Sequence, residues 1–161
     1  MAITGDEPKD FRGEFTKAMR RLQRQVLKRH NKWRRLHGVP PMEHDEKEMC
    51  VVVLVLQVLQ NLVVVYGPAL VGLYECFDNV PGKLVVDAWY DEIKMWDWGK
   101  RLKKGCGHFT QVIWKTSKLL GTGIATHGNK VFVVCNYDPR GNQNPYFDIN
   151  VPRARSDDDD K

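Results

Sequence analysis

The sequence predicts a single domain of the α+β class, in which helices pack on a small sheet. Two stretches carry apolar residues three and four positions apart, the period of an α-helix, and two strand-like segments near the C-terminus flank a three-residue turn. Helices followed by a hairpin are typical of a mixed fold. The 161 residues, 42% hydrophobic and 28% charged, suit one globular domain with its own core.

The first predicted helix occupies residues 11–35 and ends at Gly38-Val39-Pro40-Pro41, a combination that stops helices. One face carries an apolar stripe at helical spacing, made of Phe11, Phe15, Met19, Leu22, Val26, His30 and Trp33. The opposite face is basic and carries Arg20, Arg21, Arg24, Lys28, Lys32 and Arg35. Runs of like charge usually form a solvated surface, but a basic helix face can also contact an acidic membrane. The candidate membrane contacts are Arg20, Arg21, Arg24 and Lys28.

Residues 50–74 form a strongly apolar segment that allows two interpretations. One is a transmembrane helix. Against it, Gly67-Pro68 should end a helix and leave only residues 51–66, fewer than the roughly 20 that span a bilayer. Amide side chains also lie within this stretch, at Gln57, Gln60 and Asn61. A buried core helix followed by a turn is favoured, although the many valines leave helix or strand open.

The second predicted helix covers residues 83–95 and follows a turn at residues 77–82. Its helical period is carried by Val85, Val86, Trp89, Ile93 and Trp96. Two strands are then expected at residues 121–126 and 130–137, on either side of His127-Gly128-Asn129. This pattern predicts a β-hairpin with His127 at its tip.

The chain has a formal charge of +5, and the acidic run Asp157 to Lys161 contributes −3 of it, so the remainder carries +8. The DDDDK ending is similar to a protease-recognition or tag sequence, so the expected domain is 11–152, between an extension at 1–10 and a tail at 153–161. A basic domain attracts acidic partners. The N-terminal residues contain no apolar signal segment. Four cysteines (Cys50, Cys76, Cys106 and Cys135) leave the redox compartment open, and none has the spacing of a zinc motif.

Two long motifs resemble signatures of the CAP superfamily, which unites cysteine-rich secretory proteins, venom antigens and plant pathogenesis-related proteins. They are GHFTQVIWKTS at 107–117 and VVCNYDPRGN at 133–142, in the order that the family uses. Supporting matches are Arg29-His30-Asn31 with Arg34, HGVPP at 37–41, and VDAWYDEI at 86–93. The ending YFDINVP at 146–152, without a cysteine-rich extension, looks most like the Golgi-associated plant pathogenesis-related protein branch.

The resemblance implies a three-layer α-β-α sandwich with a cleft of two histidines and two glutamates that can hold a divalent metal. His108 and Glu92 match two of these four positions. If Leu73-Tyr74 marks the remaining motif, its glutamate is replaced by Val71 and its asparagine by Gly72. Zinc normally takes at least three protein ligands. We therefore expect no cofactor beyond weak zinc binding at His108, and a hydrogen-bonded His108–Glu92 pair instead.

The resemblance implies a binding module that associates with lipid, sterol or acidic membrane surfaces, and we expect no nucleic-acid partner. An alternative is a secreted protein-binding module of the venom or host-interaction type, with protein partners or a homodimer. A metal-dependent hydrolase ranks third, because the chain has no GxSxG or HExxH motif and no base is identified for Ser117 or Thr110. The expected location is the cytoplasmic face of the Golgi or outside the cell.

Overall fold

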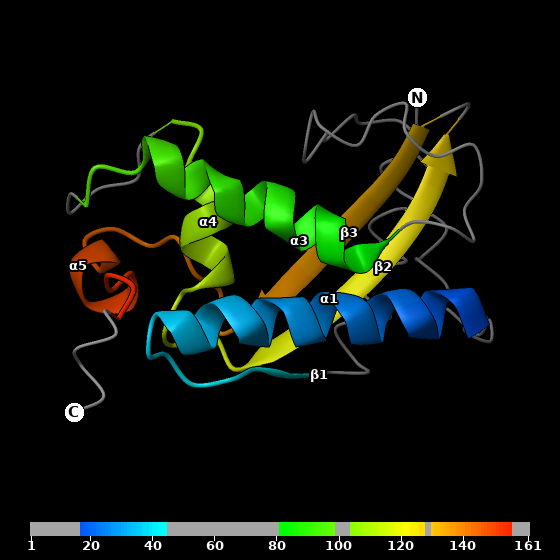
Figure 1. The fold of residues 1–161 in the computed structure, drawn as a ribbon, viewed down its shortest axis with the longest axis horizontal. Helices are drawn as coiled ribbons and strands as arrows, with labels where there is room; N and C mark the ends of the chain where they lie inside the picture. The colour runs from blue at the N-terminus through cyan, green and yellow to red at the C-terminus, as the bar shows by residue number, and fades with distance from the viewer. Residues whose placement is uncertain (1–16, 45–80, 99–103, 128–129, 156–161) are drawn as a thin grey trace, which may run out of the picture.

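The computed structural model describes residues 17–44, 81–98, 104–127 and 130–155. Their elements, in chain order, are α1 (Lys17–Leu36), β1 (Glu43–His44), α3 (Gly82–Tyr90), the 3-10 helix η3 (Asp91–Met95), α4 (Gly107–Val112), β2 (Leu119–His127), β3 (Lys130–Asp138) and α5 (Phe147–Asn150). The strand order in the sheet is β1-β2-β3, with β1 parallel to β2 and β2 antiparallel to β3. Helices packed on a small sheet confirm the predicted α+β class (Figure 1).

Helix α1 packs against β2 and lies beside α3 (Figure 1). Of the predicted apolar stripe, Leu22, Val26 and His30 are buried as expected. The structure also buries Gln23 and Arg34, two polar residues that the stripe did not include. Phe11 and Phe15 lie outside the described residues.

The contact between α1 and α3 depends on a glycine and on one carboxylate. A Cβ atom at Gly82 would lie 2.9 Å from Cγ2 of Val26, so only glycine permits this approach of the two helices. Asp87 of α3 accepts hydrogen bonds from Arg29 Nη2 at 2.7 Å and from Trp33 Nε1 at 2.9 Å. The Trp33 ring stacks on Tyr90 with 3.9 Å between ring centroids. These contacts fix α3 against the second half of α1.

The helix predicted over residues 83–95 is two elements in the structure. The α-helix ends at Tyr90, and a tighter 3-10 turn continues from Asp91 to Met95. Short 3-10 segments are common at helix ends, and they do not change the apolar spacing enough to be recognised in a sequence. The result is that Glu92 lies in the 3-10 turn and not in the α-helix.

The predicted hairpin is confirmed, with both strands slightly longer than expected. Gly121 pairs with Asn136 and His127 pairs with Lys130, which places His127 next to the turn. The two-residue strand β1 and the short helices α4 and α5 were not predicted, because elements of two to six residues are too short to show a period. His44 lies in β1.

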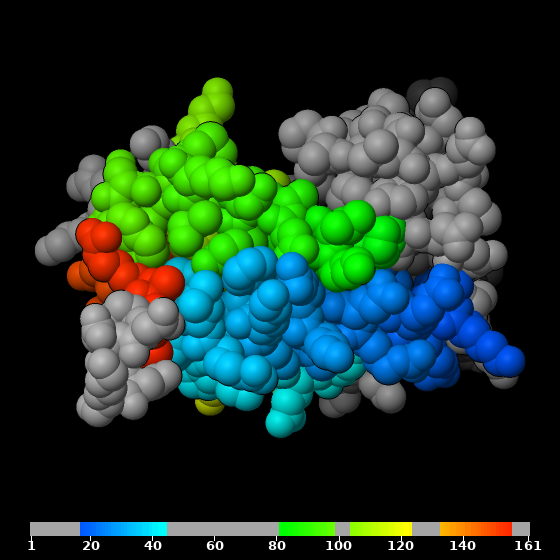
Figure 2. Space-filling model, in the orientation of Figure 1, coloured from blue at the N-terminus to red at the C-terminus, as the bar shows by residue number. Residues whose placement is uncertain are grey.

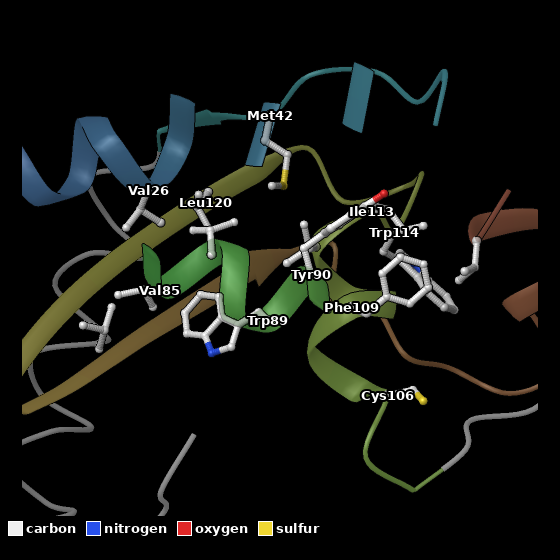
Figure 3. Packing of buried hydrophobic residues seen from close by; sticks show 14 of the residues in the cluster. Val26, Met42, Val85, Trp89, Tyr90, Cys106, Phe109, Ile113, Trp114 and Leu120 are labelled. Carbon is white, nitrogen blue, oxygen red and sulfur yellow. The ribbon is translucent and has the colours of Figure 1, made fainter. Parts of the chain in front are cut away.

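The core combines buried side chains from the helices, the sheet and the first CAP-like motif. Trp114 is 2% exposed and meets Phe147 edge to face, with 5.0 Å between the ring centroids. Figure 3 shows Tyr90, Phe109, Ile113 and Trp114 close together beneath the end of α1, with Val26, Val85 and Leu120 on the other side of the core. Each burial of such a side chain contributes about 1.5–3 kcal/mol to stability.

None of the described helices is both long and apolar enough to cross a bilayer. The apolar segment 50–74, for which a core helix was favoured over a transmembrane helix, lies outside the described residues, as do the extension 1–10 and the acidic run 157–160. Arg155, assigned to the tail, donates its backbone N–H to the carbonyl of Leu36 at 2.8 Å and so lies against the end of α1.

Candidate functional site

Glu92 and His108, the two predicted cleft residues, are in direct contact. Oε1 of Glu92 lies 2.5 Å from Nδ1 of the His108 ring. The other carboxylate oxygen, Oε2, accepts the backbone N–H groups of His108 at 2.9 Å and of Phe109 at 3.2 Å. A single side chain therefore holds both the ring and the first turn of α4, which confirms the expected hydrogen-bonded pair.

The position of Glu92 gives it the role of a helix cap. Cys106 precedes α4, and its side chain makes no capping hydrogen bond. The first backbone N–H groups of a helix have no partner within the helix, and a negative charge at that end is favourable. Glu92 supplies both the acceptor and the charge from the 3-10 turn that lies beside α4. This geometry gives Glu92 a structural role at the start of α4.

The His108 ring is held on two sides. Its Nδ1 atom contacts Glu92, its Nε2 atom is buried, and the ring is stacked on Trp89 with an angle of 11° between the ring planes. Among the residues that the structure describes, no three histidine, cysteine or acidic side chains lie together as a metal would need. The aligned positions Val71 and Gly72 fall outside those residues.

The hydroxyl groups considered for hydrolysis are buried and bound to structural partners. Ser117 Oγ donates to the carbonyl of Pro139 at 2.8 Å and accepts from Gln111 Nε2 at 3.1 Å. Thr110 Oγ1 lies 2.6 Å from Oδ1 of Asn142, which also reaches the Gly107 carbonyl with its amide nitrogen at 2.8 Å. None of these partners is a base that could activate a nucleophile. They join the two CAP-like motifs to each other.

Two histidines are buried within the fold and are bound to tyrosines. His30 contacts the carbonyl of Val26 through Nδ1 and the hydroxyl of Tyr137 through Nε2, both at 2.9 Å. Since a carbonyl only accepts, Nδ1 carries the proton and Nε2 accepts from the tyrosine. Burial lowers the pKa of His30 to about 4, so the ring is neutral at pH 7. His37 is held in the same way between the Pro152 carbonyl and Tyr90, and burial lowers its pKa too.

Arg34 is a fully buried cation whose partners are all carbonyl groups. Its guanidinium donates to the carbonyls of Pro40 at 2.7 Å, Trp114 at 2.8 Å and Ser117 at 2.9 Å, and more weakly to those of Val112 and Lys115. Burial lowers its pKa to about 10, which still leaves it charged at pH 7. The side chain thus ties the end of α1 to the turn between α4 and β2.

The four predicted membrane contacts lie together on the outer face of α1. Arg20, Arg21, Arg24 and Lys28 are all exposed, as are Lys17, Lys32 and Arg35 on the same face. Residues 17–36 contain no aspartate or glutamate. Figure 2 shows this helix, coloured blue to cyan, along the front of the molecule with its outer surface facing the viewer. The structure therefore separates the basic face from the buried face of α1, as the sequence predicted.

Comparison with known proteins agrees with the two motifs and with the geometry around them. The model of the cysteine-rich secretory protein family (CAP) matches residues 70–137. Golgi-associated plant pathogenesis-related protein 1 of Homo sapiens is 31% identical over 145 residues, which are 83% of this chain and 94% of that protein. The chain belongs to the CAP superfamily. The basic form of pathogenesis-related protein 1 of Nicotiana tabacum is 32% identical over 76% of this chain and 75% of its own length.

Solved structures confirm the CAP fold. The hookworm platelet inhibitor has a TM-score of 0.62 with 17% identity, over 83% of this chain and 76% of its own. NaASP2, crystallised with Zn²⁺, has a TM-score of 0.54 with 19% identity, over 80% of this chain and 83% of its own. At these identities the likeness concerns the fold alone.

Two features of this CAP domain were not predicted. The first is the burial of Arg34, which supports the family resemblance but belongs to a residue type that is rarely fully buried. The second is a groove lined by Arg35, Gly38 and Arg155. The only part of this groove that the sequence marks is the Gly38-Val39-Pro40-Pro41 motif, and that motif by itself predicts only the end of the helix.

Proposed function

We propose that this chain is a non-enzymatic CAP module that docks on anionic membrane surfaces through the outer face of α1. One observation carries the proposal: seven exposed cations follow one face of a 20-residue helix that has no acidic residue. At 1.5 Å per residue this face is about 30 Å long. A flat acidic surface is the partner whose charge and shape fit a straight, uniformly basic stripe.

The arrangement of these cations opposes the stability of the isolated helix. Arg20, Arg24, Lys28 and Lys32 succeed one another at spacings of four residues, so each neighbouring pair is repulsive. Such pairs cost roughly 0.2–0.5 kcal/mol each, and cations in the first turn also oppose the helix dipole. Binding to an anionic surface relieves this repulsion. A face that only contacts water has no need of cations in such a repulsive arrangement. The charge pattern therefore supports a binding role.

The site chemistry supports a binding module and not an enzyme. His108 and Glu92 are committed to capping α4, and the hydroxyls of Ser117 and Thr110 have no base beside them. Burial raises the pKa of Cys135 to about 12, so this thiol is protonated and weakly nucleophilic at pH 7. The name of the human relative, which is Golgi-associated, agrees with an endomembrane setting.

The experiment is vesicle flotation with two variants of equal net charge. One neutralises the outer face of α1 (Arg21→Gln, Arg24→Gln and Lys28→Gln). The control removes three exposed lysines elsewhere (Lys104→Gln, Lys115→Gln and Lys118→Gln). Each cation near an acidic surface contributes about 1 kcal/mol, so the helix variant should bind phosphatidylserine vesicles roughly a hundredfold more weakly. The control should stay near the unmutated chain.

If both variants lost the same amount of vesicle binding, the net charge of the protein alone would account for its attraction to the vesicles. That result would contradict docking by α1. Absence of binding by the unmutated chain to acidic and neutral vesicles alike would favour the alternative, a secreted protein-binding CAP module.

A further inference from the structure

A groove of about 340 Å³ lies where α1 ends. Its walls are formed by Asn31, Arg35, Val39, Pro40, Pro41 and Arg155, and Gly38 lies in it. Arg35 and Arg155 contribute guanidinium groups to the groove, and Val39, Pro40 and Pro41 contribute apolar surface. The groove adjoins the basic face of α1, because Arg35 belongs to both.

Arg155 is fixed in this groove by its backbone and by the shape of Gly38. Its N–H donates to the Leu36 carbonyl at 2.8 Å, and its guanidinium lies over the α-carbon of Gly38. A Cβ atom at Gly38 would lie 2.3 Å from Nε of Arg155, and its φ of +64° also favours glycine. The preceding residues are anchored too, since Pro152 is bound by His37 and Arg153 lies 4.9 Å from the Trp98 ring centre. The position of Arg155 is therefore set by the fold.

Arg35 and Arg155 have no acidic partner among the described residues. Guanidinium groups bind phosphate through two parallel hydrogen bonds each, and two of them around one groove suit a group with several free oxygens. Val39, Pro40 and Pro41 offer apolar contact for the carbon atoms that bear such a group. Phosphate is a better match than a carboxylate, which has only two oxygens.

We propose that this groove binds the phosphate of a phosphomonoester lipid headgroup when α1 docks on a membrane. A terminal phosphate has three free oxygens and a charge between −1 and −2 near pH 7, as other phosphomonoesters have. A phosphodiester has two free oxygens and one charge, and one of its other oxygens carries the rest of the headgroup. The inference rests on the proposed membrane docking and adds to it a choice of headgroup.

The first test compares vesicles of phosphatidic acid, a phosphomonoester, with vesicles of phosphatidylserine, a phosphodiester, at matched surface charge. The unmutated chain should bind phosphatidic acid vesicles about tenfold more tightly. A tenfold difference in affinity corresponds to the free energy that a charge-assisted hydrogen bond contributes. Arg155→Gln should remove that preference and keep most of the binding to phosphatidylserine. The control Arg140→Gln, another exposed arginine, should keep both. Asp157–Asp160 are present in every variant, so any competition from them affects all variants alike.

The second test removes the membrane. Glycerol 3-phosphate, a soluble phosphomonoester, should shift the amide resonances of Gly38 and Arg35 in the unmutated chain and leave them unchanged in Arg155→Gln. Binding to vesicles without any headgroup preference, together with unshifted amides, would overturn the groove proposal and leave membrane docking intact. Shifted amides without vesicle binding would instead refute membrane docking and assign the groove to free phosphomonoesters.

Discussion

Glu92 holds His108 at two points, at its ring nitrogen and at its backbone N–H. In the sequence these residues matched half of a four-residue metal cleft. In the structure they are a helix cap and the ring that the cap orients, and Phe109 donates a third hydrogen bond to the same carboxylate. These hydrogen bonds join η3 to α4.

Glu92→Ala should therefore destabilise the domain more than His108→Ala does. The glutamate variant leaves the N–H groups of His108 and Phe109 without their acceptor, and the loss of a helix cap typically costs about 1–2 kcal/mol. His108→Ala keeps both backbone bonds. Urea unfolding of the two variants measures the difference, with Glu92→Gln as the control that preserves an acceptor oxygen. An unchanged midpoint for Glu92→Ala would refute the capping role.

Zinc should bind this chain no more tightly than it binds an exposed histidine. Zinc normally takes at least three protein ligands, and among the described residues no third histidine, cysteine or acidic side chain lies beside His108 and Glu92. Titration calorimetry at pH 7 on the unmutated chain and on His108→Ala measures this. A sub-micromolar site that is lost in His108→Ala would show that residues beyond the described part of the chain complete a metal site.

Arg34→Met should be among the most damaging single changes in the domain. It removes a cation that donates to five backbone carbonyls, of which the Trp114 carbonyl keeps the N–H of Ser117 as a second donor. The expected loss is about 3–5 kcal/mol, similar to breaking a buried ionic contact. Arg34→Lys should recover little, because one ammonium group cannot reach all the carbonyls that surround the edges of the planar guanidinium. Thermal unfolding checks this, and a near-native melting temperature for Arg34→Lys would contradict it.

Stability should fall as the pH is lowered from 6.5 to about 4. The pKa of His30 is 6.5 in an unfolded chain and about 4 in the folded one, so the unfolded state binds the proton first. Full stability is present above pH 6.5, and about 3 kcal/mol is lost by pH 4. The lowered pKa of His37 acts in the same direction. Urea unfolding at pH 7 and pH 4.5 should show a smaller difference for His30→Gln than for the unmutated chain. An equal difference in both would exclude His30 as the source.

The sequence predicted the elements that are long enough to show a period and missed the ones that depend on distant partners. Helix α1 and the hairpin follow from spacing alone. The burial of Arg34 does not, because its acceptors lie about 80 residues away in a turn between α4 and β2. The pairing of Glu92 with His108 was predicted only because the motifs resemble a known family, and spacing would not have joined a 3-10 turn to a six-residue helix. The groove at Gly38 could not be predicted either, because one of its walls is formed by Arg155. No local sequence pattern shows that Arg155 lies beside Gly38.

The most direct measurement of the central claim is the partition of the unmutated chain onto vesicles at increasing salt. Attraction between exposed cations and a charged surface decays over about 8 Å at 0.15 M salt and about 3 Å at 1 M. Binding to phosphatidylserine vesicles should therefore be strong at 0.05 M salt and nearly absent at 0.5 M, and phosphatidylcholine vesicles should remain unbound throughout. Equal binding to both lipids, unaffected by salt, would show apolar insertion and would contradict docking by the basic face of α1.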